Sequence, residues 1–174
     1  MARNIEIKAR ITNIETLLPL AQAVADRGPQ VILQDDTFFA CAHGRLKLRA
    51  FADGHGELIA YHRSDAADPK TSDYLITPTA DPSGLRDTLT RALGTAGRVI
   101  KQRTLLLAGR TRIHLDRVEG LGDFLELEVV LRDDEAEAAG TAEAHALLDR
   151  LKIDASQLLA GAYVDLLRAG APLA

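Results

Sequence analysis

Charged and apolar side chains alternate along several short segments of this chain. The first such segment covers residues 4–11 and the last covers residues 124–129. Successive side chains of a strand point to opposite faces, so the charged members of each segment share one face. This face carries the neutral Asn4 and the charged Glu6, Lys8 and Arg10 in the first segment, and Glu126 and Glu128 in the last. Acids and bases repeated on one face of a sheet can bind a polyanion together with its metal ions.

Further segments between these two extend the pattern, for example residues 45–49, 101–103 and 112–116. The candidate anion-binding bases are Lys8, Arg10, Lys47, Arg49, Arg63, Lys101, Arg103 and Arg112. The candidate acids are Glu6, Glu57, Asp116, Glu126 and Glu128. Guanidinium groups bind phosphate oxygens bidentately and ammonium groups act as point charges. Carboxylates supply the hard oxygen ligands that Mg²⁺ or Mn²⁺ prefers.

The composition limits the number of domains and the classes of partner that this chain can have. The chain has 174 residues, of which 47% are hydrophobic and 26% charged, and we expect a single domain over residues 1–174. The net charge of −4 gives no overall basic field, so we expect no nucleic-acid partner. One cysteine, Cys41, excludes an intramolecular disulfide. Neither a signal peptide nor a membrane-spanning run is recognisable, so we expect a cytoplasmic protein without a membrane partner.

Periodicity predicts eight strands and four helices. The strands are expected at residues 3–12, 31–41, 45–52, 57–63, 73–79, 98–108, 111–118 and 123–131. The helices are expected at residues 13–27, 81–93, 141–152 and 156–168. Short turns join most of the strands, which predicts antiparallel pairing.

An amphipathic sheet must cover its apolar face, and the amphipathic helices are available to do so. The charged face would then point into a barrel or tunnel, the reverse of the usual small barrel with an apolar interior. The fold class is therefore α+β, an eight-stranded antiparallel barrel with a charged interior and helices outside. A charged face in solvent is the alternative for any one strand, but agreement among several strands argues against it.

These segments resemble the CYTH superfamily, the triphosphate tunnel metalloenzymes that include class IV adenylyl cyclases, thiamine triphosphatases and inorganic triphosphatases. The family's opening Glu-x-Glu-x-Lys strand is matched by residues 4–8, with Asn4 in place of the first glutamate. Its basic pairs are matched by Lys47 with Arg49 and by Lys101 with Arg103. Its later elements are matched by Arg112, Asp116, Leu121-Gly122-Asp123-Phe124-Leu125-Glu126-Leu127-Glu128 and Tyr163-Val164-Asp165-Leu166-Leu167.

The resemblance implies an eight-stranded tunnel that binds a nucleoside triphosphate or another small triphosphate with two divalent ions, Mg²⁺ or Mn²⁺. It implies metal binding by Glu6, Glu126 and Glu128, with Asp116 as a further ligand. The implied triphosphate-binding residues are Lys8, Arg10, Lys47, Arg49, Arg63, Lys101, Arg103 and Arg112. The implied catalytic residues are Lys8, Arg63, Arg112 and Asp116. Asn4 would be a weaker metal ligand than the glutamate it replaces, because a neutral amide oxygen binds a cation less strongly than a carboxylate.

Three functions remain open at this point. The first is an adenylyl cyclase that converts ATP to cyclic AMP and pyrophosphate, which the resemblance slightly favours. The second is a triphosphatase acting on tripolyphosphate, thiamine triphosphate or a nucleotide, and the third is a non-catalytic binding module. His114 is expected to be a structural histidine, and Lys70 to lie in a solvated loop. The sequence reveals no aromatic platform for a base, and a homodimer is compatible with it but not established.

Overall fold

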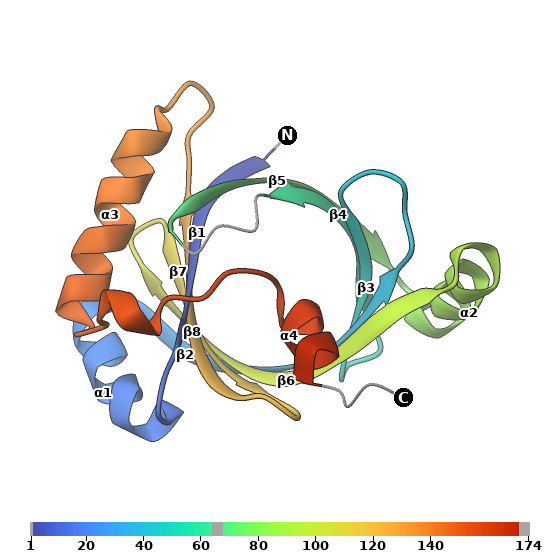
Figure 1. Ribbon diagram of the computed structural model, residues 1–174, viewed down its shortest axis with the longest axis horizontal. Coiled ribbons are helices and arrows are strands. Elements are labelled where there is room, and N and C mark those ends of the chain that lie inside the picture. The colour runs from blue at the N-terminus through green and yellow to red at the C-terminus, as the bar shows by residue number, and fades with distance from the viewer. Residues whose placement is uncertain (1, 64–67, 171–174) are drawn as a thin grey trace.

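The protein forms a closed barrel of eight antiparallel strands, described here from a computed structural model that covers residues 2–63 and 68–170. The strands are β1 (Ala2–Arg10), β2 (Arg27–Phe39), β3 (Arg45–Phe51), β4 (Gly56–Arg63), β5 (Lys70–Thr79), β6 (Thr95–Ala108), β7 (Thr111–Val118) and β8 (Gly122–Val130). Around the barrel they follow the order β1-β5-β4-β3-β2-β6-β7-β8. The expected eight-stranded antiparallel barrel is thus confirmed (Figure 1).

Helices lie around the outside and at one end of this barrel. They are α1 (Ile14–Val24), α2 (Pro82–Leu93), α3 (Glu137–Arg150) and α4 (Tyr163–Gly170), with a short 3₁₀ helix, η1 (Ala155–Gln157). Figure 1 shows α1 and α3 against one side of the barrel, α2 on the opposite side and α4 at the barrel opening. No helix within the described residues is long and apolar enough to span a bilayer.

The main hydrophobic core lies outside the barrel wall rather than within it. Ile5 and Ile7 of β1 and Leu127 of β8 point outward and are almost completely buried under the helices. Leu17 of α1 and Leu147 of α3 pack onto the same cluster. Apolar burial stabilises by about 25 cal/mol per Å² of area removed from water. The strands can therefore turn their charged positions inward because their apolar positions are covered outside.

Local sequence signals explain where two helices begin. Asn13 caps α1, since its side-chain oxygen accepts a hydrogen bond from the amide of Thr16 at 2.8 Å. Asp81 caps α2 in the same way through the amide of Gly84 at 2.9 Å. The end of the first helix was predicted less well: α1 stops at Val24, and residues 27–29 already belong to β2.

The predicted helix over residues 156–168 is wrong. Asp154 caps the turn of η1, and the chain then becomes extended, so that the amide of Leu159 donates to the carbonyl of Lys8 at 2.9 Å. Gly161, at a φ of 79°, takes a left-handed conformation in which glycine is favoured. Hydrogen bonding to the edge of β1 and this turn replace the middle of the expected helix, and α4 begins only at Tyr163.

The helix α2 does not contribute to the core as its apolar stripe had suggested. None of its residues, all of which lie in the described part of the chain, is buried. Leu93 at its end is 41% exposed. Cover of the apolar sheet face by helices therefore comes mainly from α1 and α3.

We predict that Gly140 is required for the close packing of α3 on β1. A Cβ atom at this position would lie 2.7 Å from both Ile5 Cγ1 and Leu131 Cδ2. Gly140→Leu should lower the free energy of unfolding by about 1–3 kcal/mol, as overpacking of a filled core does. Gly170→Leu in α4 is the matched control, because no described atom lies within 4 Å of a Cβ there. Equal denaturant midpoints for both variants would contradict the prediction.

Candidate functional site

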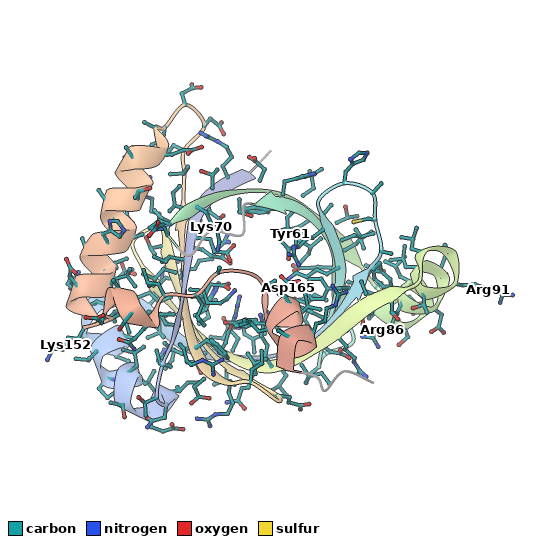
Figure 2. All side chains as sticks on the ribbon, in the orientation of Figure 1. Tyr61, Lys70, Arg86, Arg91, Lys152 and Asp165 are labelled. Atoms are coloured by element: carbon teal, nitrogen blue, oxygen red, sulfur yellow. The ribbon has the colours of Figure 1, made fainter. Side chains whose placement is uncertain are left out.

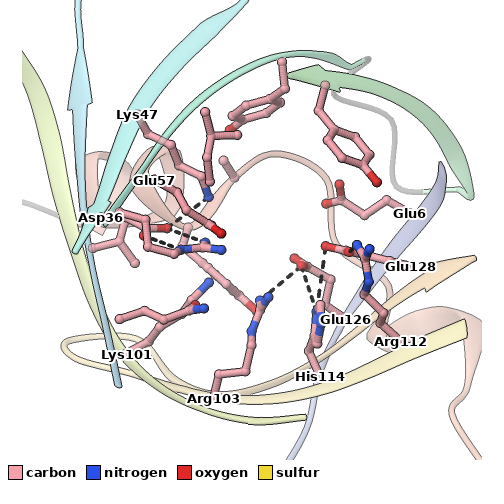
Figure 3. A pocket seen from close by; sticks show the side chains of 18 of the residues that line it. Glu6, Asp36, Lys47, Glu57, Lys101, Arg103, Arg112, His114, Glu126 and Glu128 are labelled. Atoms are coloured by element: carbon pink, nitrogen blue, oxygen red, sulfur yellow. Dashed lines mark hydrogen bonds and ion pairs between the residues drawn. The ribbon is translucent and has the colours of Figure 1, made fainter. Parts of the chain in front are cut away.

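The barrel encloses a cavity of about 360 Å³ to which all eight strands contribute side chains. Its polar lining consists mainly of residues at every second position of each strand, as the alternation in the sequence predicts. Figure 3 looks into this cavity and shows ionic side chains converging from several strands. Figure 2 gives the same side chains in the context of the whole molecule. The expectation of a charged interior is confirmed.

One side of the cavity is a basic wall, formed by Lys47 and Arg49 of β3 and by Lys101 and Arg103 of β6. Asp36 of β2 lies between them and accepts two hydrogen bonds from Arg49, both at 2.8 Å, and one from Lys47 at 3.0 Å. Burial alone would raise the pKa of Asp36, but the charges of Arg49 and Lys47 outweigh it and hold the pKa well below its usual range. Asp36 is therefore a fixed anion that orders the wall.

The opposite side is an acidic wall of Glu6 on β1 and Glu126 and Glu128 on β8. These strands lie across the barrel from β2 and β3 in the strand order. Lys8 approaches Glu126 Oε2 at 3.0 Å, and Arg112 donates to Glu128 Oε2 at 3.0 Å. Burial would raise the pKa of Glu126, yet the charge of Lys8 and the neighbouring bases hold it well below its usual range. Both walls are visible in Figure 3, with Glu6 and Glu128 facing Lys47 and Asp36.

Arg103 is anchored beneath the cavity by Asp116. Its guanidinium donates to the two Asp116 oxygens at 2.7 and 2.6 Å, and it also reaches Glu126 at 3.2 Å. The hydroxyl of Tyr163, at the start of α4, donates to Asp116 at 2.9 Å. The Tyr163 ring also lies 4.2 Å below Lys8 Nζ, at a distance typical of a cation–π contact. The C-terminal helix thus helps to position two bases of the cavity.

Asp116 lies outside the lining of the cavity. It is 0% exposed. Its oxygens already accept hydrogen bonds from Arg103 and Tyr163, and Lys101 lies 3.5 Å away. These contacts position Arg103, and the metal-binding and catalytic roles expected of Asp116 stay predictions.

Most of the other predicted residues come together. Those that line the cavity are Glu6, Lys8, Lys47, Arg49, Glu57, Lys101, Arg103, Arg112, Glu126 and Glu128. Arg10 does not: it is exposed, donates to the carbonyl of Leu121 at 2.9 Å and lies over the ring of Phe124. The expected triphosphate contact of Arg10 is therefore not supported. The side chain of Arg63 falls outside the described residues, although its backbone belongs to β4.

Comparison with known proteins identifies the architecture. The family model described as the CYTH domain matches residues 2–163. The chain belongs to the CYTH family. Its members bind triphosphate substrates and are generally enzymes.

Solved structures show the same CYTH fold at low sequence identity. A protein of Pyrococcus horikoshii OT3 is 23% identical with a TM-score of 0.84, covering 94% of this chain and 99% of its own. A Vibrio parahaemolyticus protein provisionally assigned as an adenylate cyclase is 19% identical with a TM-score of 0.79, covering 95% and 97%. A Hippeastrum protein, provisionally an adenylyl cyclase and described as having a dominant triphosphatase activity, is 16% identical with a TM-score of 0.70, covering 99% and 98%. No curated protein matches the chain.

Several lining residues of this CYTH tunnel were not predicted from the sequence. Asp36 is one of them; its neighbour Asp35 points to the other face, where it pairs with Arg98 at 2.8 Å. Asp36 lies two residues from both Gln34 and Phe38, which also line the cavity, and this spacing was the sequence signal for its inward direction. Lys70, expected in a solvated loop, begins β5 and is only 5% exposed, although it is not one of the residues that line the cavity.

An apolar rim, defined as Ile32, Phe51 and Leu105, was also missed. On β2, β3 and β6 each of these residues lies beyond the charged positions toward the same end of the barrel, away from α4. Gln34 pairs with Phe51 and Arg103 with Ile32 across neighbouring strands. The tunnel therefore passes from ionic to apolar lining along these three strands.

The residues of the acidic wall fit a divalent cation. Ligand atoms of His114, Glu126 and Glu128 all lie within 4.8 Å of one another. Two lining residues beside the acidic wall, Asn4 and His114, also have buried polar atoms, Oδ1 and Nδ1, without a hydrogen-bond partner among the described residues. An unpaired buried polar group costs about 1–3 kcal/mol, so such atoms favour a bound ligand. Asn4 is thus placed in the cavity with a carbonyl oxygen available.

We predict that triphosphate binding takes up a proton at Lys101. Burial, followed by the charge of Arg103, lowers the pKa of Lys101 to about 7, so above pH 7 the free protein loses this charge. A bound polyanion favours the ammonium form, and affinity should therefore fall as the pH rises above 7. Calorimetry of tripolyphosphate at pH 8, in buffers of different ionisation enthalpy, should detect uptake approaching about one proton.

Lys101→Arg is the control for this measurement, because arginine keeps its charge throughout the range. The variant should bind with a flatter pH dependence and without the extra proton. If it takes up as many protons as the unaltered protein, Lys101 is not the titrating group.

Proposed function

We propose that this CYTH protein is a metal-dependent enzyme that acts on a nucleoside triphosphate, with conversion of ATP to cyclic AMP and pyrophosphate as the first candidate reaction. The supporting observation is the opposition of a basic and an acidic wall inside one closed barrel. A triphosphate between them would have its oxygens against guanidinium and ammonium groups. Its metal ions would lie between the phosphates and the carboxylates.

The basic wall suits a chain of phosphates rather than a single one. Arg49 and Arg103 are held by bidentate pairing with Asp36 and Asp116, so their donors are already oriented. Phosphoryl transfer depends mainly on such positioning and on charge neutralisation. Lys8 and Lys101, both over the ring of Tyr163, add charge at the base of the cavity.

Glu6, Glu126 and Glu128 would hold divalent ions, which supply Lewis-acid stabilisation of phosphate charge and activate the attacking oxygen. Arg112, paired with Glu128, lies on the acidic side and can contact phosphate oxygens from there. In a cyclase the attacking oxygen is the ribose 3′-hydroxyl, and in a hydrolase it is water.

The apolar rim supports an organic group on the substrate. Ile32, Phe51 and Leu105 offer nothing to a bare phosphate chain, whereas an aromatic ring can stack on a nucleobase. The rim also lies next to the basic wall along the same strands, so a nucleotide could span both. Inorganic tripolyphosphate would use only the charged part of the tunnel.

Hydrolysis of the triphosphate is the second candidate. The three rim residues provide no hydrogen bond to a sugar hydroxyl, which a cyclase must orient. The Hippeastrum protein, described as having a dominant triphosphatase activity, shares this fold. A non-catalytic binding module is the third candidate. Asn4 argues for it, because this residue replaces the family's first glutamate and would bind a metal ion less strongly.

Product analysis distinguishes these reactions. Purified protein with Mg²⁺ or Mn²⁺ and ATP should yield cyclic AMP and pyrophosphate if it is a cyclase, and orthophosphate without cyclic nucleotide if it is a hydrolase. Glu128→Gln should reduce turnover by at least about 10–100-fold and raise the metal requirement, since it removes a charge from the acidic wall. Glu119→Gln, on the exposed turn between β7 and β8, is the matched control.

Ligand-induced thermal stabilisation without any turnover would instead identify a binding module and overturn the enzymatic proposal. Unchanged metal dependence in Glu128→Gln would remove this residue from the metal site.

Replacing Phe51 tests the preference for an organic triphosphate. Phe51→Ser should weaken ATP binding by about tenfold or more, because stacking of a base on an aromatic ring contributes about 1–3 kcal/mol. Binding of tripolyphosphate should change little. Leu33→Ser, at a 52% exposed position on the outer face of β2, is the control. Equal weakening of both ligands in Phe51→Ser would exclude the rim as a base-binding surface.

A further inference from the structure

His114 occupies an unusual place in the acidic wall. It lies on β7 directly opposite Glu126 of β8, and Arg112, two residues earlier, lies opposite Glu128. The imidazole therefore points into the cavity beside both carboxylates (Figure 3). Its residue is only 4% exposed.

The contacts of the imidazole are long for hydrogen bonds. His114 Nδ1 lies 3.5 Å from Glu126 Oε1 and 3.8 Å from Glu128 Oε1, and it has no hydrogen-bond partner within the described residues. A good N–H···O bond is about 2.7–3.2 Å long. A structural histidine, the role expected from the sequence, would be held by a closer partner.

The two carboxylates are each oriented toward this nitrogen. Glu126 Oε2 is bound by Lys8 at 3.0 Å and Glu128 Oε2 by Arg112 at 3.0 Å. Glu128 Oε1 faces His114, and Glu126 Oε1 lies between His114 and Arg103, whose guanidinium donates to it at 3.2 Å. Outer partners of this kind commonly fix metal ligands in place. Ligand atoms about 2.1 Å from an octahedral ion lie about 3 Å apart. The two distances from His114 Nδ1 exceed this value by less than an ångström, and all three ligand atoms lie within 4.8 Å of one another.

We propose that His114 supplies a nitrogen ligand, alongside Glu126 and Glu128, to a divalent ion in the tunnel, so that this site selects Mn²⁺ over Mg²⁺. The inference rests on the proposed metal-dependent function but adds the ligand and the choice of ion. Mg²⁺ is bound almost entirely by oxygen and keeps several waters. An imidazole shifts preference toward transition-metal ions, which accept nitrogen ligands more readily.

The test uses Mn²⁺ alone with the whole protein. Pulsed electron paramagnetic resonance of one equivalent of Mn²⁺ should show electron spin-echo modulation from ¹⁴N of a bound imidazole. Labelling the unaltered protein with ¹⁵N-histidine should replace this pattern with that of ¹⁵N, without any change in sequence or fold. Absence of histidine nitrogen coupling in bound Mn²⁺ would overturn the proposal.

Calorimetry of His114→Gln provides the second measurement. Mn²⁺ affinity should fall by about 10–100-fold, while Mg²⁺ affinity changes much less. His145→Gln, at an exposed position on α3, is the matched control and should bind both ions as before. Equal losses for both ions in His114→Gln, in a variant with unchanged thermal unfolding, would contradict nitrogen ligation.

These results are separable from the proposed function. Nitrogen coupling in a protein that turns over no triphosphate would uphold the ligand and reject the enzyme. Turnover with Mg²⁺ and Mn²⁺ alike, with no nitrogen coupling, would uphold the enzyme and reject the ligand.

Discussion

The structure depends on the neutralisation of charge inside a closed barrel. Moving an unpaired ion out of water costs several kcal/mol even after the protein relaxes. The interior meets this constraint by pairing across adjacent strands: Asp36 with Arg49, Asp116 with Arg103 and Glu126 with Lys8. Each pair lies on one sheet face in register, so the geometry of the barrel itself supplies the partners.

A charged interior moves the hydrophobic core to the outside of the wall. The main apolar cluster joins β1, β6, β7 and β8 to α1 and α3. A second cluster, around Phe124 and Tyr163, lies where α4 meets the barrel end. Between these clusters the barrel keeps a cavity of about 360 Å³ that both ionic and apolar side chains line.

Alternation in the sequence was sufficient to predict the barrel and most of the cavity, because strand periodicity alone decides which residues share a face. It gave Lys47 and Arg49, Lys101 and Arg103, and Glu126 and Glu128 correctly as lining residues. It could not distinguish Asp116 from these lining residues, because Asp116 also lies at an inward-facing position of its strand. Whether an inward side chain reaches the cavity depends on what lies over it, here Arg103 and the hydroxyl of Tyr163.

Tertiary contacts also explain the other differences from the sequence prediction. Apolar residues 158–167 have helical spacing, but the backbone at Leu159 is hydrogen-bonded to Lys8 on β1, which a helix would prevent. Arg10 has the right parity but lies beyond Phe124, whose buried ring separates it from the cavity. Phe51 became recognisable as a rim residue only when β2, β3 and β6 were placed side by side.

Internal pairing also determines how such a tunnel can bind a polyanion. Every base of the basic wall except Lys101 is already within hydrogen-bond distance of a carboxylate, and Lys101 lies 3.5 Å from Asp116. A triphosphate alone would add negative charge to an interior whose own carboxylates are held ionised by these same bases. A divalent cation held by Glu126 and Glu128 would restore the balance, because it would offset the added negative charge while Lys8 and Arg112 keep the two carboxylates in place. Metal and triphosphate should therefore bind with positive coupling, and this coupling arises from the ion pairs that stabilise the empty barrel.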